Sequence, residues 1–294
     1  MSGQPRRYRV RHVTRYEYDE VLEACYNRAL LRPRPTEEQR VLSSSVAVSP
    51  DPDVISEHVD YFGNHSLYLE TRKPGTALVV TAESVVEVSR QAPAIEALNR
   101  WTLADAAAAA GDRFPTVDFL LPSPLIATDD AVSRYAALVL RPELGVGDAL
   151  AALNAAIRRD FAYVSGVTSV GTTLAELLEL RQGVCQDFAH LAIGCARSVG
   201  LPARYVSGYL ETAPPPGRAK LRGADATHAW ASVLTPQGWV DLDPTNDQFV
   251  DSSYIVTAWG RDFSDVSPLR GVVFTEAAGS VLEVAVDVEP LPQR

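Results

Sequence analysis

Apolar and polar residues alternate with a period of two along the first third of the chain. The alternation is clear in RYRVRHVTRYEY, in HSLYLETR and in ALVVTAESVVEV, and this period is that of a strand with one buried face. Stretches such as SPDPDV and RKPGT separate these segments and indicate turns. The pattern predicts an N-terminal β-rich domain, residues 1–92, folded as a β-sandwich or as a strongly curved antiparallel sheet.

The spacing of apolar residues becomes helical after Arg90. Helices are predicted in WTLADAAAAAGDRF, DDAVSRYAALVL, VGDALAALNAAIRRDFAYV and TTLAELLELRQG, of which the third should end near Asp160. Threonines can cap the start of the last one, and Gly183 can end it. One more helix should begin near Cys185 and end at the sequence GLP that follows it. We assign residues 93–149 to a helical connecting region.

A period of two returns in the last third of the chain. It is found in ARYVSGYLE, THAWASVLT, GWVDLDP, SYIVTAW, RGVVFTE and SVLEVAVDV. Helices followed by antiparallel strands are typical of the α+β class. The sequence thus predicts a core of helices packed on an antiparallel sheet, which spans residues 150–294 and includes the C-terminal strands.

Charge and composition exclude several classes of protein. The net charge is −10, whereas a nucleic-acid-binding protein needs a basic face to neutralise phosphates. No stretch approaches the about 18 consecutive apolar residues of a membrane-spanning helix, and the N-terminus has no apolar signal-peptide segment. We therefore expect no nucleic-acid partner, no membrane insertion and a cytoplasmic location, while the sequence does not predict the oligomeric state.

The three cysteines, Cys25, Cys185 and Cys195, include no CxxC pair. Their odd number and wide spacing argue against a disulfide framework and a structural zinc site, so we expect neither a metal nor a cofactor. Cys185 should lie at a helix N-terminus, where free N–H groups and the helix dipole favour the nucleophilic thiolate. Cys195 lies in an apolar run and should be buried. Because cysteine is commonly a core residue, a structural role for Cys185 stays open.

A cysteine nucleophile needs a base, and the chain has five histidines. His12, His58 and His65 lie on predicted strands and turns of the N-terminal half and should be solvated. His190 follows Cys185 by five residues on the same helix, about 140° away around the axis at 3.6 residues per turn. It should not reach the sulfur, which leaves one histidine.

That histidine, His228, begins the strand THAWASVLT, which a turn joins to GWVDLDP. A turn at Thr235–Pro236 places Asp243 directly opposite His228, and a turn that includes Gly238 changes this by one position. Opposed residues have Cβ atoms about 4.5–5.5 Å apart, so the carboxylate can orient the imidazole as the third member of a triad does. Asp241 lies on the same face but further away. An ordinary cross-strand surface pair is the alternative interpretation.

Three blocks, GVCQDFAHLAIGCARSVGLPARYVSGYL, DATHAWASV and GWVDLDPTN, resemble the transglutaminase-like superfamily and in particular its bacterial cysteine-peptidase-like branch. The resemblance covers about residues 150–265, and the segment from RYRVRHVTRYEYDEVLEA to DYFGNHSLYLE also looks like the β-rich domain that precedes the core in this branch. It implies a papain-like or transglutaminase-like core, with Cys185 as the nucleophile, His228 as the base and Asp243 as its orienting group. It also implies attack on an amide carbonyl and a thioester intermediate. The sequence has no DxDxDG-type cluster, so calcium dependence is not implied.

The oxyanion hole is only partly defined by the resemblance. The backbone N–H of Cys185 should be one donor. Eukaryotic transglutaminases use an upstream tryptophan as the second, but Trp101 is too distant in the sequence to match. Tyr163 is the substitute that we consider.

Three further residues, Gln186, Asp187 and Trp230, match the family's pattern. Gln186 and Trp230 are candidates for substrate contacts, although a buried core anchor is the preferred interpretation of Trp230. Asp187 is interpreted as a first-turn helix carboxylate, and Asn246 as scaffold. The loop 211–226, rich in proline, glycine and charge, should be mobile and border the site because it leads to the histidine.

The resemblance implies a thiol-dependent hydrolase whose partner is a peptide or protein amide. A protein-glutamine γ-glutamyltransferase, in which an amine resolves the thioester, shares every catalytic residue and stays open. A non-catalytic scaffold is the third hypothesis, against which the intact Cys185, His228 and Asp243 argue.

Overall fold

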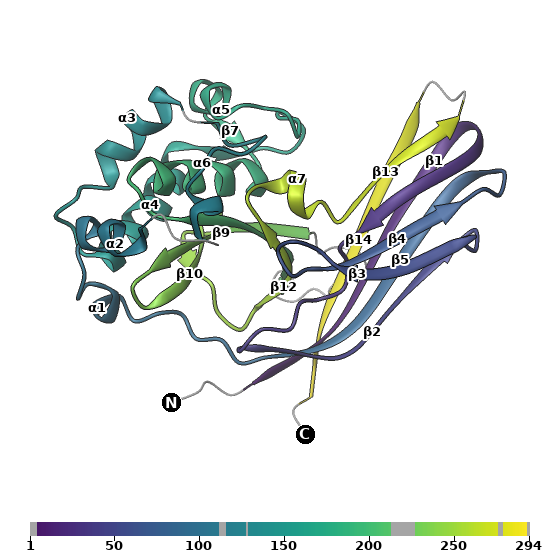
Figure 1. Cartoon of the computed structure of the whole chain (residues 1–294), viewed down its shortest axis with the longest axis horizontal. Helices are drawn as coiled ribbons and strands as arrows, with labels where there is room; N and C mark the ends of the chain where they lie inside the picture. The colour runs from purple at the N-terminus through teal and green to yellow at the C-terminus, as the bar shows by residue number, and fades with distance from the viewer. Residues whose placement is uncertain (1–4, 112–115, 128, 213–226, 276–278, 293–294) are drawn as a thin grey trace, which may run out of the picture.

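The computed structural model describes residues 5–111, 116–127, 129–212, 227–275 and 279–292. Two regions lie side by side: a twisted sheet made from both ends of the chain, and a helix-covered sheet made from the rest (Figure 1). The predicted α+β class and the β-rich N-terminal half are confirmed. No helix in the described ranges is long and apolar enough to cross a membrane.

The N-terminal sheet is built around β1 (Arg6–Ala29), a strand of 24 residues. β5 and β4 pair with successive parts of β1 along one edge, and β14 and β13 do so along the other. β2 pairs with β5, and β3 pairs with β4. The other strands of this sheet are β2 (Gln39–Ser49), β3 (Val54–Val59), β4 (His65–Thr71), β5 (Gly75–Val88), β13 (Leu269–Thr275) and β14 (Ser280–Leu291).

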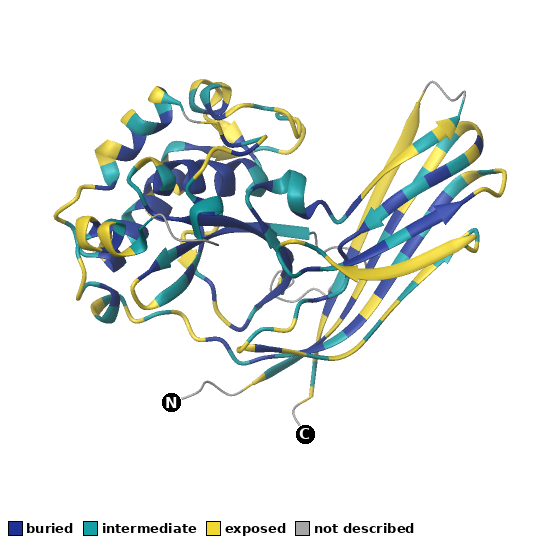
Figure 2. Ribbon diagram, viewed as in Figure 1, coloured by how far each residue is buried: buried dark blue, intermediate teal, exposed yellow. Residues whose placement is uncertain are grey.

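This sheet bends until its two halves face each other. Leu67 and Leu69 of β4 share one buried cluster with Leu78 and Val80 of β5, and Cys25 of β1 lies in the same cluster. Buried residues alternate with less buried ones along β5, which Figure 2 shows as stripes along the strands. The result is the strongly curved, sandwich-like sheet that the period of two predicts.

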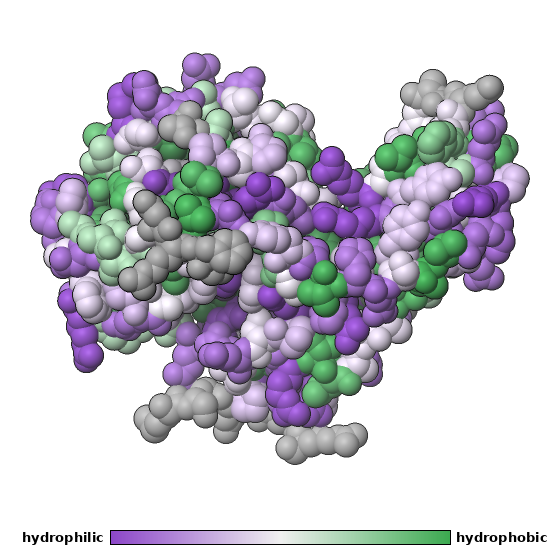
Figure 3. Space-filling view, viewed as in Figure 1, coloured by the Kyte–Doolittle hydropathy of each residue, from purple (hydrophilic) through white to green (hydrophobic). Residues whose placement is uncertain are grey.

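The last two strands return to the N-terminal sheet. β13 and β14 form their ladders with β1, although the boundaries drawn from the sequence group them with the core. Apolar side chains of these strands remain exposed, among them Val272, Phe274 and Leu282, and Figure 3 shows hydrophobic residues on the projecting arm of the molecule. Both ends of the chain thus contribute to one sheet.

The second region contains a five-stranded antiparallel sheet in the order β11-β10-β9-β8-β12. α6 packs on β9 and β8, and α3, α4 and α5 pack around α6. The strands are β8 (Ala203–Leu210), β9 (Thr227–Thr235), β10 (Gly238–Asp243), β11 (Gln248–Phe249) and β12 (Tyr254–Gly260). The helices are α1 (Ile95–Leu98), α2 (Leu103–Ala110), α3 (Asp130–Val139), α4 (Val146–Asp160), α5 (Leu174–Leu180), α6 (Cys185–Ser198) and α7 (Phe263–Val266), with a 3₁₀ turn at Thr116–Phe119. All of the helices predicted from the sequence are present.

An apolar cluster joins the two regions. It contains Tyr8, Val10 and Val86 from the N-terminal sheet and Tyr209 and Ile255 from β8 and β12. The strands of the helix-covered sheet therefore pack directly against the N-terminal sheet, and the two regions share buried surface.

His12 lies in this contact between the regions, and the prediction that it is solvated was wrong. Only 1% of the residue is exposed, because β8 covers the inner face of β1 at this point. One ring nitrogen lies 3.0 Å from the hydroxyl of Tyr209, and the other lies 2.9 Å from that of Thr14. His58 is exposed and His65 is half-buried.

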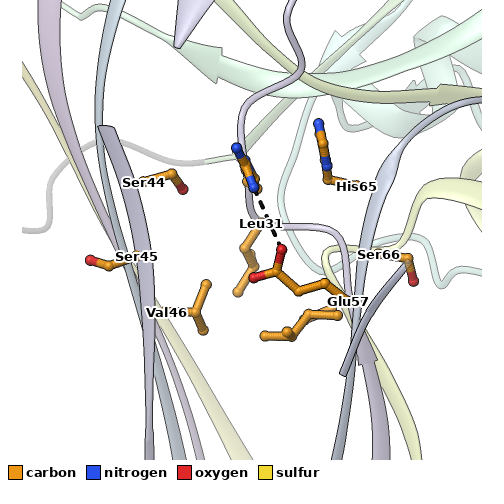
Figure 4. A pocket seen from close by; sticks show the side chains of 10 residues that line it. Leu31, Ser44, Ser45, Val46, Glu57, His65 and Ser66 are labelled. Carbon is orange, nitrogen blue, oxygen red and sulfur yellow. Dashed lines mark ion pairs between the residues drawn. The ribbon is translucent and has the colours of Figure 1, made fainter. Parts of the chain in front are cut away.

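A small pocket of about 40 Å³ opens at the mouth of the bent sheet. Ser44 and Val46 of β2 face Glu57 of β3 and His65 of β4 across it, and Glu57 forms an ion pair of 3.5 Å with Arg32, which also lines the pocket (Figure 4). A site of this volume is large enough to hold water.

Candidate active site

Cys185 is the first residue of α6, as the sequence predicts. A short parallel pair, β6 (Ala162–Tyr163) with β7 (Gln182–Gly183), delivers the chain to this helix start. Gly183 lies so close to Asp187 that a Cβ on it would come within 2.8 Å of the carboxylate Oδ2. The absence of a side chain there lets the chain enter the helix in this position.

Asp187 fastens the start of α6 to the preceding loop. Its Oδ2 accepts hydrogen bonds from the backbone N–H of Val184, at 2.8 Å, and from the hydroxyl of Thr168, at 2.7 Å. Asp187 is nearly fully buried, and its burial raises the pKa of the carboxyl above its usual value, although both hydrogen bonds oppose this. The carboxylate is directed at the helix start and the loop, in agreement with a structural first-turn role.

His228 and Asp243 are in contact, with 2.7 Å between Nε2 and Oδ2. The register differs from the one expected, because the turn places Thr235 opposite Gly238 and Leu242 opposite Ala231. Asp243 is therefore two positions out of direct register with His228. Diagonal neighbours in a ladder remain within reach of long side chains, and the imidazole spans the offset.

Asp243 is fully buried and its two oxygens are saturated with donors. Oδ1 accepts the backbone N–H groups of Thr245 at 2.9 Å and Asn246 at 3.3 Å. Oδ2 accepts hydrogen bonds from Nε2 of His228, from the side-chain amide of Asn246 at 2.7 Å and from the hydroxyl of Tyr254 at 2.7 Å. Burial by itself raises the pKa of Asp243, but these hydrogen bonds outweigh it and hold the pKa below its usual value.

The imidazole of His228 interacts with Asp243 on one side and with Cys185 on the other. Burial by itself lowers the pKa of His228, but the hydrogen bond to Asp243 and the interaction with the Cys185 side chain outweigh it and raise the pKa to about 10. Since Nε2 is bound to Asp243, Nδ1 is the nitrogen left for the sulfur. The arrangement favours an imidazolium beside the cysteine at neutral pH.

Trp230 and Asp241 form a second pair with the same diagonal offset. The indole Nε1 donates to Asp241 Oδ2 at 3.2 Å, so Asp241 is paired with Trp230 and is not the carboxylate that orients His228. Trp230 is fully buried, and its ring packs edge to face against Tyr254 with centroids 5.3 Å apart. Its N–H is thus engaged and its ring shielded, which makes it a core anchor rather than a substrate contact.

Gly208 makes room for this packing. It pairs with His228 across the β8–β9 ladder. A Cβ at this position would lie 2.6 Å from the ring of Trp230 and 2.0 Å from the carbonyl oxygen of Ile255. A larger residue would push the rings beneath His228 out of place.

Tyr163 and Gln186 are the remaining candidate residues. Tyr163 pairs with Gly183 in the β6–β7 ladder, and its ring lies 6.4 Å from that of Phe188. The residue is 52% exposed, and it is close enough to Cys185 for the thiol to influence the pKa of Tyr163, which burial chiefly raises. Gln186 is half-buried in the first turn of α6, where backbone N–H groups have no intrahelical acceptor.

Other potential nucleophiles and bases lie away from this constellation. Cys195 is fully buried, as predicted, and burial raises its pKa strongly. Cys25 is buried in the N-terminal sheet. His190 is almost fully buried and accepts the backbone N–H of Phe263 at 3.2 Å, which agrees with the expectation that it points away from Cys185.

Sequence reasoning missed Tyr254 and assigned Asn246 to the scaffold. Asn246 follows the strand of Asp243 by three residues, a local signal that could have indicated its bond to the carboxylate. Tyr254 lies on β12, which is at the far edge of the sheet from β10, so no ladder position connects it with Asp243. Of the loop 211–226, residues 213–226 lie outside the described residues.

No group of three or more His, Cys, Asp or Glu side chains in the described ranges could hold a metal ion. The constellation around Cys185 consists of a thiol, an imidazole and a carboxylate, which are the groups of thiol-based acyl chemistry.

Comparison with known proteins identifies the family. Residues 8–87 match the model of the bacterial transglutaminase-like N-terminal region, and residues 134–244 match that of the transglutaminase-like superfamily. The uncharacterized protein Rv2569c of Mycobacterium tuberculosis is 44% identical over 293 residues, which cover 97% of this chain and 93% of the relative. The chain belongs to the transglutaminase-like superfamily. The uncharacterized protein ML0607 of Mycobacterium leprae is 34% identical over 288 residues, covering 97% of this chain and 99% of the relative.

A solved structure shows the same fold as this transglutaminase-like protein. It is the crystal structure of a proposed cysteine protease from Cytophaga hutchinsonii, with a TM-score of 0.78 and 20% sequence identity. The match covers 100% of this chain and 96% of the other. Both the N-terminal sheet and the core therefore occur together in a second protein with the same overall arrangement.

Proposed function

We propose that this transglutaminase-like protein is a thiol-dependent hydrolase of peptide or isopeptide amides. The observation that carries the proposal is the 2.7 Å contact between His228 Nε2 and buried Asp243 Oδ2, with Cys185 beside the same imidazole at the start of α6. A nucleophile at a helix start, a base within reach and a buried acceptor that orients the base form a triad.

In the acylation step, the Cys185 thiolate attacks the amide carbonyl and the carbonyl electrons move onto oxygen. The backbone N–H groups of the first turn of α6 are the donors available to this oxyanion, and Tyr163 is the nearby side chain that we propose as a further donor. The C–N bond then breaks, the leaving nitrogen takes the proton from the His228 imidazolium, and a thioester remains on Cys185. Asp243 keeps the imidazole oriented during the transfer.

In the deacylation step, neutral His228 removes a proton from a water molecule. The hydroxide attacks the thioester carbonyl, and the C–S bond breaks to release a carboxylic acid. The proton taken from water stays on His228 and Cys185 leaves as a thiolate, which restores the starting pair. An amine in place of water would give a new amide instead, and this transamidation would use the same catalytic residues.

The three cysteines support a reducing compartment. All of them are free, and a reactive thiol is kept reduced most readily in the cytoplasm. We accordingly propose a cytoplasmic location and a peptide or protein as the substrate.

The test begins with brief alkylation by limiting iodoacetamide at neutral pH, with the modified cysteine mapped by mass spectrometry. We expect selective labelling of Cys185 in the wild-type chain and loss of this selectivity in His228→Ala. Equal labelling of all three cysteines would contradict an activated thiolate and favour the scaffold hypothesis.

Incubation with a peptide library, with and without an added primary amine, then separates the two chemistries. Hydrolysis adds the mass of water across a broken amide, whereas transamidation joins the amine to the acyl fragment. Amine adducts in the absence of new carboxyl termini would replace the hydrolase proposal with the transferase.

A further inference from the structure

One oxygen of Asp243 serves three side chains that come from different segments. Oδ2 lies 2.7 Å from Nε2 of His228 on β9, 2.7 Å from Nδ2 of Asn246 after β10, and 2.7 Å from the hydroxyl of Tyr254 on β12. An orienting carboxylate needs only the first of these contacts. The other two lie where they compete with the imidazole for the same lone pairs.

The direction of the Tyr254 hydrogen bond is set by its other partner. Gln248 on β11 directs its side-chain Nε2 at the Tyr254 oxygen, and an amide N–H can only donate. The phenolic oxygen therefore accepts from Gln248, and its own proton is directed at Asp243. Because hydrogen bonds in a chain polarise one another, the donor from Gln248 strengthens the bond that Tyr254 donates.

A donor on Oδ2 reduces the negative charge that the carboxylate can offer to the imidazolium. An imidazolium held too strongly is a poor proton donor to the leaving amine, because general acid catalysis is most effective when the pKa lies near the working pH. Since His228 is flanked by a carboxylate and a thiol, a device that weakens one of these contacts favours turnover.

The titratable groups that face this site come from six elements of the described structure. Cys185 from α6 and Asp243 from β10 act on His228 of β9, while Tyr254 from β12 acts on Asp243. Near α6, Cys185 and Asp187 both act electrostatically on Tyr163 and Tyr205 and contribute to raising the pKa of these tyrosines. Of these groups, Tyr254 alone is a neutral donor to the carboxylate.

We propose that Tyr254 is a positioning residue of the triad, whose hydroxyl shares the charge of Asp243 Oδ2 and so limits how strongly Asp243 holds the proton on His228. The proposal rests on the proposed function in one respect, that His228 is the base. It gives a residue of β12 a role in the proton transfer between His228 of β9 and its partners.

The experiment measures the protonation of His228 by long-range ¹H–¹⁵N NMR of the ring nitrogens as the pH is raised. It uses the full chain in a Cys185→Ser background, because removing the thiol leaves Asp243 and its donors as the direct influence on the imidazole. Tyr254→Phe is compared with Tyr209→Phe. Both tyrosines are buried and hydrogen-bonded, but Tyr209 contacts His12 and not the triad.

We expect the titration midpoint of His228 to rise by about 0.5 pH unit in Tyr254→Phe, a change of about threefold in proton affinity. Tyr209→Phe should leave the titration midpoint of His228 unchanged, while it lowers the free energy of unfolding about as much as Tyr254→Phe does. An unchanged or lowered midpoint in Tyr254→Phe would overturn the proposal, because a purely structural hydroxyl does not move this titration upwards.

A second variant covers the case in which Tyr254→Phe does not fold. Gln248→Met removes the donor that polarises the Tyr254 hydroxyl, and we expect a smaller rise in the same midpoint. No rise would count against the proposal.

Failure of iodoacetamide to label Cys185 selectively in the wild-type chain would count against the proposed hydrolase. It would not count against the proposed role of Tyr254, since the NMR titration measures the protonation of the His228 ring directly.

Discussion

Gln39 of the N-terminal sheet and Val256 of β12 are joined by two hydrogen bonds in opposite directions. The side-chain Nε2 of Gln39 donates to the carbonyl of Val256 at 2.8 Å, and the N–H of Val256 donates to Gln39 Oε1 at 2.9 Å. Asn64 makes the same two-way contact with Trp259 further along β12, at 2.9 and 3.0 Å. Since β12 is an edge of the five-stranded sheet, the two amides occupy positions that a neighbouring strand would otherwise fill.

The edge contact predicts a loss of stability in Gln39→Leu. Gln39 is fully buried, and its removal leaves the N–H of Val256 without a partner, while the carbonyl keeps a bond from the backbone N–H of Arg34 at 3.0 Å. An unpaired buried backbone group costs about 1–3 kcal/mol, and we expect the free energy of unfolding in urea to fall by this amount.

Gln237 provides the matched control for Gln39. It also bonds to a backbone carbonyl through its side-chain amide, that of Ala97, but it lies in a surface turn. Gln237→Leu should change the free energy of unfolding by less than about 0.5 kcal/mol. Equal losses in the two variants would show that the edge contact of β12 is not what Gln39 stabilises.

Cys185→Ser and Cys195→Ser should separate chemistry from stability. Cys185 is half-buried at the helix start, so its replacement should abolish amide hydrolysis with little change in the unfolding free energy. Cys195 is enclosed by apolar side chains of the main core, and a hydroxyl buried there should cost about 1–3 kcal/mol with turnover retained in the folded fraction. Turnover and urea unfolding are measured for both, and an equal loss of turnover would contradict the assignment.

Patterns along the chain were sufficient to predict much of this site. The position of Cys185 follows from local signals, because a glycine and a change of period mark the helix start. The pairing of His228 with Asp243 follows from the order of strand, turn and strand, although the turn proved to contain only Pro236 and Gln237 between the paired residues. The shifted register still brought the two together because an imidazole is long enough to span a diagonal.

Contacts between distant segments could not be predicted. The burial of His12 depends on β8 covering β1, and the place of β13 and β14 depends on the return of the chain to β1. Neither leaves a trace in the local period, because an alternating strand looks the same whichever sheet it joins. The same limit applies to Tyr254, which reaches Asp243 from the opposite edge of its sheet.

The bond between Thr168 and Asp187 predicts the mobility of the loop before α5. The hydroxyl of Thr168 donates to Asp187 at the start of α6 over 2.7 Å. The loop around Thr168 contains Gly166, with a positive φ, and exposed Val167 and Val170. Thr168→Val keeps the shape of the side chain and removes the bond. Hydrogen exchange of residues 165–172 should become about fivefold faster, as expected for the loss of about 1 kcal/mol.

Thr172→Val is the control for this loop. Its hydroxyl accepts the backbone N–H of Ser169 at 2.9 Å within the loop itself and does not reach α6. Faster exchange near Ser169 alone is expected there. If Thr168→Val left the exchange of the whole loop unchanged, the contact with Asp187 would not be what holds it.

Burial of His12 predicts that the protein loses stability in mild acid. Burial lowers the pKa of His12 to about 4 from its ordinary value of 6.5, so the unfolded chain binds a proton at this residue between those values while the folded chain does not. Stability must therefore fall as the pH decreases from about 6.5 towards 4. His12→Gln, which can still bond to Tyr209 and Thr14 but does not titrate, should reduce this fall by about 2 kcal/mol between pH 7 and pH 4.5.

The measurement is urea unfolding of wild type, His12→Gln and His58→Gln at pH 7 and at pH 4.5. His190, whose pKa is likewise lowered to about 4 by burial, contributes equally to all three chains and cancels in the comparison. His58 is exposed, so His58→Gln should show the same fall as the wild type. A fall of the same size in His12→Gln would mean that the contact between β1 and β8 opens before His12 is protonated, and that the two sheets separate ahead of global unfolding.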